Sequence, residues 1–182
     1  MNKVVVNSKY NKEMHKKFYM FHMFRRSFSF YFVIALAIFV TYIAIKQTIA
    51  NQDDSTTIIA VWLLTALTII MTPSIMVFRI FKATKTEAKE RGETVEILEF
   101  TKDKVLRRIS GESKIVLGWH NMEAIYETKE AFLIYLMENQ GLVVDKNCIT
   151  EGNVELLRKL ITNNMKPNKK GKIAFKKVYK GE

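Results

Sequence analysis

Two long apolar runs dominate the hydrophobic pattern in the first half of the chain. Residues 28–45 (FSFYFVIALAIFVTYIAI) and 56–78 (TTIIAVWLLTALTIIMTPSIMVF) contain no charged side chain. A helix needs about 20 apolar residues to cross about 30 Å of hydrocarbon, where the backbone must satisfy its own hydrogen bonds. Two buried helices of a soluble domain are the less favoured alternative, because the runs have no polar face. The pattern predicts two transmembrane helices, joined as an antiparallel hairpin by the short connection 46–55.

Short apolar segments separated by turns follow in the second half. Six segments rich in β-branched and aromatic residues recur at intervals of about 8–12 residues, which is typical of an antiparallel sandwich or barrel. In order they are TVEILEF, KVLRRIS, SKIVLGW, MEAIYET, AFLIYLM and GLVVDKN. Val154, Leu157 and Ile161 then recur at helical spacing. They predict an amphipathic helix over Thr150–Asn164 that closes the open end of the sheet, with Thr150 as its N-cap.

These elements predict an α+β membrane protein, in which a transmembrane helical hairpin precedes a small antiparallel β sandwich or barrel closed by a C-terminal helix. Gly92 is expected to end the charged continuation of the second helix. The predicted segments are a cytoplasmic N-terminal segment (1–27), the first transmembrane helix (28–45), a short outer loop (46–55), the second transmembrane helix (56–78), a juxtamembrane helix or linker (79–92), a soluble domain (93–164) and a basic tail (165–182).

The net charge of +11 is concentrated outside the predicted domain. Lys and Arg outnumber acids seven to one in 1–27, five to two in 79–92 and seven to one in 163–182, whereas 93–162 has nine basic and twelve acidic residues. Basic residues stay on the cytoplasmic side of a membrane, and the hairpin connection holds only Lys46. Both termini are therefore expected in the cytoplasm of a multi-pass cell-membrane protein. No signal-peptide cleavage site follows the first run.

The basic tail mixes lysines with apolar and aromatic residues. Each Lys near an anionic leaflet contributes about 1 kcal/mol, and aromatic rings insert at the interface. Contact with the lipid bilayer, and with its anionic inner-leaflet lipids, is expected from Arg25, Arg26, Arg79, Lys82, Lys169, Lys170, Lys172, Phe175, Lys176, Lys177 and Tyr179. Because the tail lacks arginine, a nucleic-acid partner is not expected. A solvated, disordered terminus is the remaining alternative.

Candidate catalytic and metal-binding residues are few. No local signature of a nucleophile surrounds Cys148, the single cysteine. His120 has no further ligand at a known metal spacing. Glu123, Glu127 and Glu130 are of the type used in acid–base chemistry, but they lie in or beside a turn and are expected to be solvated. The sequence therefore predicts a protein that is not an enzyme and that needs no metal or cofactor.

Three threonines share one helical face of the second apolar run. They are Thr65, Thr68 and Thr72. We expect them to hydrogen-bond across the hairpin to Thr41 or Tyr42, as polar groups between transmembrane helices do. Pro73 removes one backbone donor and is expected to kink the second helix near its cytoplasmic end.

Several stretches of the chain occur in an order typical of one family. They are the leading KVVVNSKY, the two spans, GETVEILEF, LGWHNMEAIYETKEAFLIYL and NVELLRKLI. The element order resembles a pleckstrin-homology-like domain, and nearly the whole chain resembles the YcxB-like family of bacterial membrane proteins. Where that family has Pro-Lys-Arg after an apolar run, this chain has Asp145, Lys146 and Asn147, so only Lys146 matches. The resemblance implies a fold and a membrane location, and no biochemical activity.

Trp119 ends an apolar segment within that block, so its large ring is expected in the structural core.

Some pleckstrin-homology domains bind phosphoinositides through basic residues of the first hairpin, where Lys102, Lys104, Arg107 and Arg108 lie. The two arginines are adjacent on one strand and point to opposite faces, so headgroup binding there is less favoured.

The leading hypothesis is a non-catalytic integral membrane protein that displays a pleckstrin-homology-like interaction or regulatory domain at the cytoplasmic face. The alternative is an accessory subunit of a transport or envelope-stress complex, recognised through its transmembrane hairpin. In both hypotheses the protein partner is unknown, and a homo-oligomer is one option.

Overall fold

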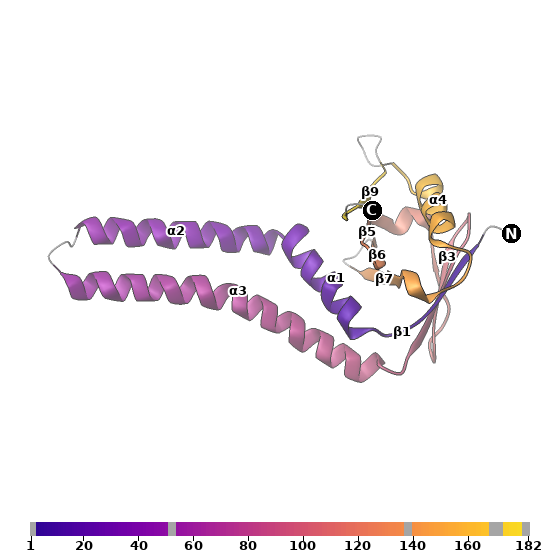
Figure 1. Cartoon of the computed structure of the whole chain (residues 1–182), viewed down its shortest axis with the longest axis horizontal. Coiled ribbons are helices and arrows are strands. Elements are labelled where there is room, and N and C mark those ends of the chain that lie inside the picture. The colour runs from indigo at the N-terminus through magenta and orange to yellow at the C-terminus, as the bar shows by residue number, and fades with distance from the viewer. Residues whose placement is uncertain (1–2, 51–53, 137–139, 168–172, 180–182) are drawn as a thin grey trace. The chain divides into compact units, whose positions relative to one another are not determined.

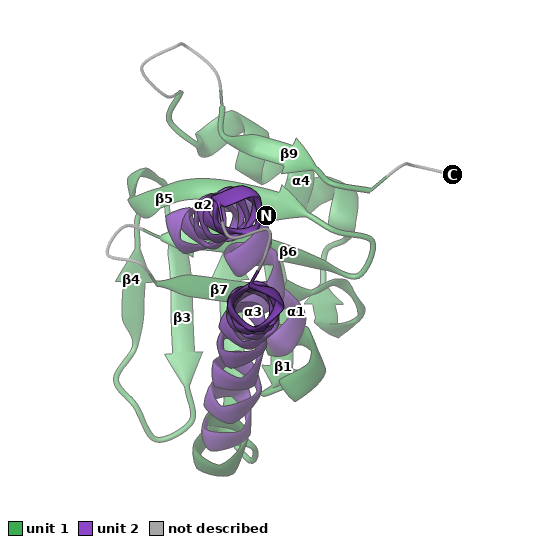
Figure 2. Cartoon of the chain, turned by 90° about the vertical axis from the view of Figure 1, so that its left-hand side faces the viewer, with its two compact units in different colours: residues 1–15, 87–182 green, residues 16–86 purple. Residues whose placement is uncertain are grey.

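The computed structural model describes residues 3–50, 54–136, 140–167 and 173–179. The chain forms two compact units, coloured separately in Figure 2. One comprises residues 1–15 and 87–182, and the other comprises residues 16–86. The first unit contains the sheets, and the second contains the long helices. The chain therefore leaves the first unit after its N-terminal strand and returns to it after the hairpin.

Two long helices, α2 (Phe28–Ala50) and α3 (Ser55–Arg91), occur at the two apolar runs and lie antiparallel (Figure 1). Each is long and apolar enough to cross a membrane. Only 6% of the most apolar 18-residue window of each helix is buried, which is unlike the core helix of a soluble protein. The helix α3 includes the charged stretch that follows the second run, and Gly92 comes directly after its last residue.

The threonines of α3 do not make the cross-hairpin hydrogen bonds expected of them. The hydroxyls of Thr65, Thr68 and Thr72 donate to the backbone carbonyls four residues earlier in their own helix, at 2.8–2.9 Å. Within a helix that carbonyl is always in reach of a threonine hydroxyl, whereas a partner on another helix needs a specific register. A hydrogen bond from Trp62 Nε1 to Thr48 Oγ1, at 2.9 Å, joins the two helices.

A further helix, α1 (Lys12–Arg25), forms within the segment expected only to be a cytoplasmic lead-in. Its N-cap is Asn11, whose side-chain oxygen accepts hydrogen bonds from the backbone N–H groups of Glu13 and Met14. Charged residues are concentrated in the first half of α1 and aromatic residues in the second half, without a clear apolar stripe, so the sequence lacks the periodic pattern that marks most surface helices.

Two β-sheets build the first unit, in which all six expected strand segments form strands. One sheet has the order β4-β3-β2-β1-β8 and the other has the order β7-β6-β5-β9. The strands are β1 (Val4–Lys9), β2 (Val95–Phe100), β3 (Val105–Ile109), β4 (Ile115–Leu117), β5 (Met122–Glu127), β6 (Ala131–Leu136), β7 (Gly141–Asp145), β8 (Ile149–Glu151) and β9 (Phe175–Lys177). Neighbouring strands are antiparallel except for β5 and β9, which are parallel.

The unit is wider than the domain expected over residues 93–164. Strand β1 lies between β2 and β8, with Val4 opposite Phe100 and Lys9 opposite Val95. Strand β9 extends the other sheet, from within the stretch expected to be a separate tail. The sequence did not show these pairings because β1 and β9 come from parts of the chain far from the continuous meander.

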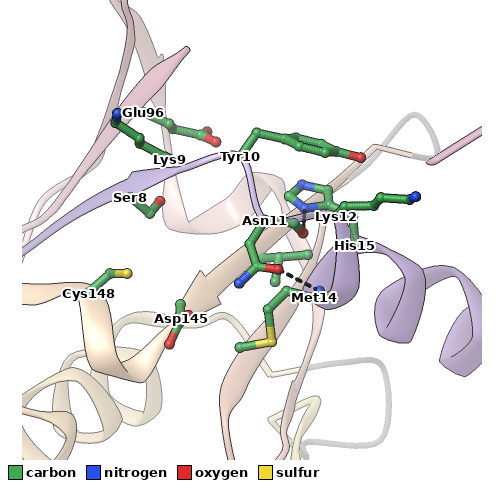
Figure 3. Close-up of a pocket in the computed structure, with 11 residues that line it drawn as sticks. Ser8, Lys9, Tyr10, Asn11, Lys12, Met14, His15, Glu96, Asp145 and Cys148 are labelled. Atoms are coloured by element: carbon green, nitrogen blue, oxygen red, sulfur yellow. Dashed lines mark hydrogen bonds between the residues drawn. The ribbon is translucent and has the colours of Figure 1, made fainter. Parts of the chain in front are cut away.

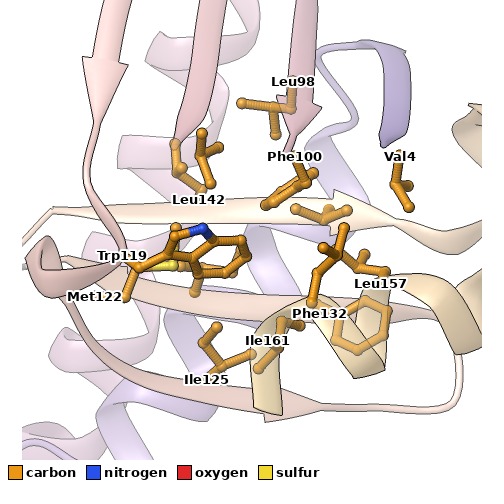
Figure 4. Packing of buried hydrophobic residues seen from close by; sticks show 14 of the residues in the cluster. Val4, Leu98, Phe100, Trp119, Met122, Ile125, Phe132, Leu142, Leu157 and Ile161 are labelled. Atoms are coloured by element: carbon orange, nitrogen blue, oxygen red, sulfur yellow. The ribbon is translucent and has the colours of Figure 1, made fainter. Parts of the chain in front are cut away.

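An apolar core lies between the sheets and the helix α4 (Val154–Asn164), shown in Figure 4. Phe100, Phe132 and Leu157 are fully buried within it. Trp119 is 5% exposed and packs with its ring centre 6.2 Å from that of Phe100. Its indole N–H donates to the carbonyl of Thr101, at 3.0 Å.

The C-terminal helix begins later than Thr150. Asn153 is the N-cap, and its side-chain oxygen accepts a hydrogen bond from Leu156 N at 2.8 Å. Thr150 is instead the second residue of β8, and its hydroxyl donates a hydrogen bond to the carbonyl of Val5, at 3.2 Å. Both residue types cap helices well, so the sequence alone did not separate them.

Candidate functional site

The side chain of Glu127, the last residue of β5, is fully buried at the end of the core. This corrects the expectation that Glu127 is solvated, while Glu123 and Glu130 are exposed. Side chains alternate between the two faces of a strand, so Glu127 shares a face with the core residue Ile125. The spacing of two residues between Ile125 and Glu127 on the predicted strand was the signal in the sequence that could have indicated the burial of Glu127.

Three side chains from distant parts of the chain converge on the Glu127 carboxylate. Arg158 of α4 binds it with two nitrogens, Nη2 at 2.7 Å from Oε1 and Nε at 3.0 Å from Oε2. Lys146 Nζ, just after β7, is 2.7 Å from Oε1 and also donates to the carbonyl of Thr128. Tyr179 donates its hydroxyl to Oε1 at 2.8 Å. We call Glu127, Lys146, Arg158 and Tyr179 the Glu127 cluster.

Electrostatics keep this carboxylate ionised. Burial on its own raises the pKa of Glu127, but the hydrogen bonds from Arg158, Lys146 and Tyr179 outweigh it and lower the pKa to about 2. The same pairing raises the pKa of Arg158. A buried carboxylate that is charged and hydrogen-bonded does not exchange protons near neutral pH, so it is suited to holding segments together and unsuited to acid–base catalysis.

The cluster fixes part of the basic tail to the domain. Strand β9 pairs with β5, and Phe175 packs against the core. The ring of Tyr179 lies 4.8 Å from Lys146 Nζ. Phe175 and Tyr179 are half-buried against the domain, and their expected contact with a membrane surface stays a prediction.

The other expected membrane-surface residues stay a prediction. Arg25, Arg79, Lys82, Lys176 and Lys177 are exposed, and Arg26 is half-buried. Lys169, Lys170 and Lys172 lie outside the described residues.

A second feature of this unit is a cavity of about 400 Å³ lined by residues 8–12, Met14, His15, Asp145 and Cys148, among others (Figure 3). His15 stacks on Tyr10 with ring centres 4.2 Å apart, and its Nδ1 is 2.9 Å from the carbonyl of Asn11. Asp145 accepts a hydrogen bond from the N–H of Asn147. The cavity is large enough for a small molecule.

The thiol in this cavity is a weak nucleophile. Burial, and then the negative charge and hydrogen bond of Asp145, raise the pKa of Cys148. Thiolate is the reactive form of cysteine, so these contacts work against covalent chemistry at this position.

Across the described parts of the chain, no group of three or more His, Cys, Asp or Glu side chains is arranged to hold a metal ion. His120 is exposed, at the 3₁₀ turn between the sheets.

The third feature is the open edge of the five-stranded sheet. Strand β4 is last in its order, and among the described residues it pairs with β3 alone. Its residues Ile115 and Val116 are 40% and 60% exposed, although adjacent residues of a strand point to opposite faces. An edge strand with apolar side chains exposed on both faces is a surface to which another extended chain can add.

Comparison with known proteins gives one match. The family model described as YcxB-like protein matches residues 100–161, which is about a third of the 182 residues. The match covers the last residue of β2, the strands β3 to β8 and most of α4, and it confirms for these residues the resemblance inferred from the sequence. No curated protein and no solved structure matches the chain.

Proposed function

We propose that this chain, which is similar to the YcxB-like family over residues 100–161, is a non-catalytic integral membrane protein. Its hairpin crosses the cell membrane twice, with both termini in the cytoplasm. The β-sheet unit, with a pleckstrin-homology-like arrangement of sheets and C-terminal helix, serves as an interaction or regulatory module at the cytoplasmic face.

The observation that carries this proposal is the exposure of the hairpin's apolar side chains. Large side chains such as Phe32, Ile38 and Leu64 are 62%, 66% and 63% exposed. In water this surface would cost on the order of 25 cal/mol per Å², whereas lipid removes that cost. Arg79, Lys82 and Lys85 follow the second span, and the hairpin connection holds only Lys46, which supports a cytoplasmic location for the β-sheet unit.

The chemistry of the β-sheet unit supports a role in binding. The partners of Glu127 keep it ionised near neutral pH, and the raised pKa of Cys148 keeps it as a thiol. Neither state favours proton transfer or nucleophilic attack near neutral pH. The unit offers a surface for binding at the open edge of β4, where Ile115 and Val116 are exposed.

In-cell cross-linking of the full chain, followed by mild detergent extraction, capture and mass spectrometry, tests the proposal. Three chains are compared: the unmodified chain, Val116→Lys at the β4 edge, and Thr65→Leu in the hairpin. We expect a stoichiometric partner that Val116→Lys loses and Thr65→Leu keeps. A fragment that starts at residue 92 is unsuitable, because it lacks β1, an interior strand of the five-stranded sheet.

A second candidate function follows from a groove in the hairpin. Val40, Ile43, Val61, Leu64 and Thr68 line an apolar hollow of about 230 Å³ together with Thr65. Such a groove suits another transmembrane helix, as in an accessory subunit of a transport or envelope-stress complex. This function is supported, and the leading proposal is contradicted, if Thr65→Leu loses the partner while Val116→Lys keeps it.

A further inference from the structure

Every residue that lines the cavity of about 400 Å³ belongs to the β-sheet unit. The walls come from the end of β1, the start of β2, the end of β7, the first turn of α1 and the turn after β7 (Figure 3). Strand β1 buries Val4 and Val6 completely, and the next residue on that face is Ser8, which lines the cavity. The cavity therefore begins where the apolar core ends along β1.

The side-chain oxygens of the acidic and amide residues that line the cavity already accept hydrogen bonds from the protein. The carboxylate of Glu96 is paired with Arg107 of β3. A side-chain oxygen of Asp145 accepts a hydrogen bond from the N–H group two residues later, at 2.9 Å. The side-chain oxygen of Asn11 accepts hydrogen bonds from two N–H groups in the first turn of α1. A ligand that donates hydrogen bonds would have to share these oxygens with protein donors.

The donors around the cavity are available to a ligand. Within the described parts of the chain, neither Lys9 nor Lys12 forms an ion pair, and the hydroxyl of Ser8 makes no hydrogen bond. Both lysines are exposed, so they lie at the rim of the cavity, and Ser8 is half-buried. Ammonium groups and a hydroxyl favour a ligand that accepts hydrogen bonds through charged oxygens.

The balance of charge in the lining also favours an anion. Of its Lys, Arg, Asp and Glu side chains, Lys9 and Lys12 are positive, and Glu96 and Asp145 are negative. Because Arg107 compensates the charge of Glu96, one positive charge remains. A ligand with a single negative charge brings the lining to neutrality.

Other parts of the lining are apolar or aromatic. Met14 is 7% exposed, and Val143 is half-buried. The rings of Tyr10 and His15 stack with their centres 4.2 Å apart. Such walls favour a ligand that has an apolar part beside its charged group.

We propose that this cavity binds a small organic carboxylate, with the charged group at Lys9, Lys12 and Ser8 and the apolar part against Met14 and Val143. The cavity volume lies within the range of small-molecule sites, which is about 300–1,000 Å³. The inference goes beyond the proposed function, because it gives the β-sheet unit a small-molecule ligand whether or not the hairpin crosses a membrane.

Alkylation of Cys148 measures occupancy of the cavity. Cys148 lines the cavity and is the single cysteine of the chain. The full chain in detergent is treated at pH 8 with iodoacetamide, an uncharged reagent, in the presence of increasing benzoate, benzamide or benzylamine. We expect benzoate to slow the alkylation in a saturable way. Neutral benzamide and cationic benzylamine should leave the rate unchanged at the same concentrations.

Lysine variants test which groups hold the anion. Lys9→Gln and Lys12→Gln, combined in one chain, remove both cations. They should raise the benzoate concentration needed for half-maximal protection on the order of tenfold. Lys102→Gln is the matched control, because Lys102 is also exposed but lies in the turn after the opposite end of β2. It should leave the protection unchanged.

A further control separates binding from an effect of benzoate on the reagent. In a Cys148→Ser chain that carries Lys102→Cys, benzoate should not change the rate of alkylation. The inference is overturned if benzoate gives Cys148 no saturable protection, if benzamide or benzylamine protects it equally, or if the double lysine variant keeps the protection of the unmodified chain. All these measurements are made in detergent, so none of the outcomes contradicts the proposed membrane function.

Discussion

At the scale of single residues, Glu127 determines how the tail, the β7 turn and α4 are held together. It is fully buried and accepts hydrogen bonds from Lys146, Arg158 and Tyr179. Removing one partner of a buried charge pair generally costs several kcal/mol, because the remaining charge stays buried. The contact of Lys146 with Glu127 provides a structural reason for a lysine at this turn.

The first prediction concerns acid stability. The pKa of Glu127 is about 2 in the folded chain and 4.5 when unperturbed, so its stabilising effect is fully present above pH 4.5 and is lost as the pH falls towards 2. The loss amounts to about 3 kcal/mol, from the difference between the two pKa values. Denaturant unfolding of the full chain in detergent between pH 6 and pH 2.5 measures it. Glu127→Gln should flatten this pH dependence, and an unchanged slope in the variant would contradict the assignment.

The second prediction concerns Cys148. Because burial and Asp145 raise the pKa of its thiol, alkylation by iodoacetamide at pH 8 should be slower than that of a free cysteine. Asp145→Asn removes the charge and keeps a side chain able to cap the following 3₁₀ turn, so it should accelerate alkylation severalfold. Equal rates in both chains would show that Asp145 does not control the thiol.

At the scale of elements, the sequence predicted those with a regular pattern. The two apolar runs became α2 and α3, and the six β-favouring segments became β2 to β7. Strand β9 and helix α1 have no such pattern. Strand β9 is stabilised by pairing with β5, which is distant in sequence, and α1 begins at a local cap, Asn11. The Glu127 cluster could not be predicted for the same reason: its four residues come from four separate elements or turns, and only the fold brings them together.

The third prediction tests the start of α4. Asn153→Ala removes the side-chain acceptor for Leu156 N and should lower the free energy of unfolding by about 1 kcal/mol. Thr150→Ala is the matched control, because Thr150 precedes the helix and its hydroxyl contacts the carbonyl of Val5. We expect a smaller loss for Thr150→Ala in denaturant unfolding; the reverse order would place the N-cap at Thr150.

At the scale of the whole molecule, the chain combines a lipid-compatible hairpin with a β-sheet unit that contains residues from both sides of it. Strand β1 precedes the hairpin, and all the other strands follow it. In the proposed membrane protein, the first and last parts of the chain must therefore meet on the same side of the membrane for the sheet to form. This structural requirement agrees with the two spans proposed for the hairpin and with the basic residues that flank them.

Cysteine labelling in right-side-out and inside-out membrane vesicles tests the central claim most directly. In a Cys148→Ser background, Ser55→Cys reports the hairpin connection and Lys114→Cys reports the β-sheet unit. A membrane-impermeant maleimide should label Ser55→Cys only in right-side-out vesicles and Lys114→Cys only in inside-out vesicles. Labelling of both positions from the same side, or release of the chain from the membrane by alkaline carbonate, would contradict a membrane-spanning hairpin that displays the β-sheet unit to the cytoplasm.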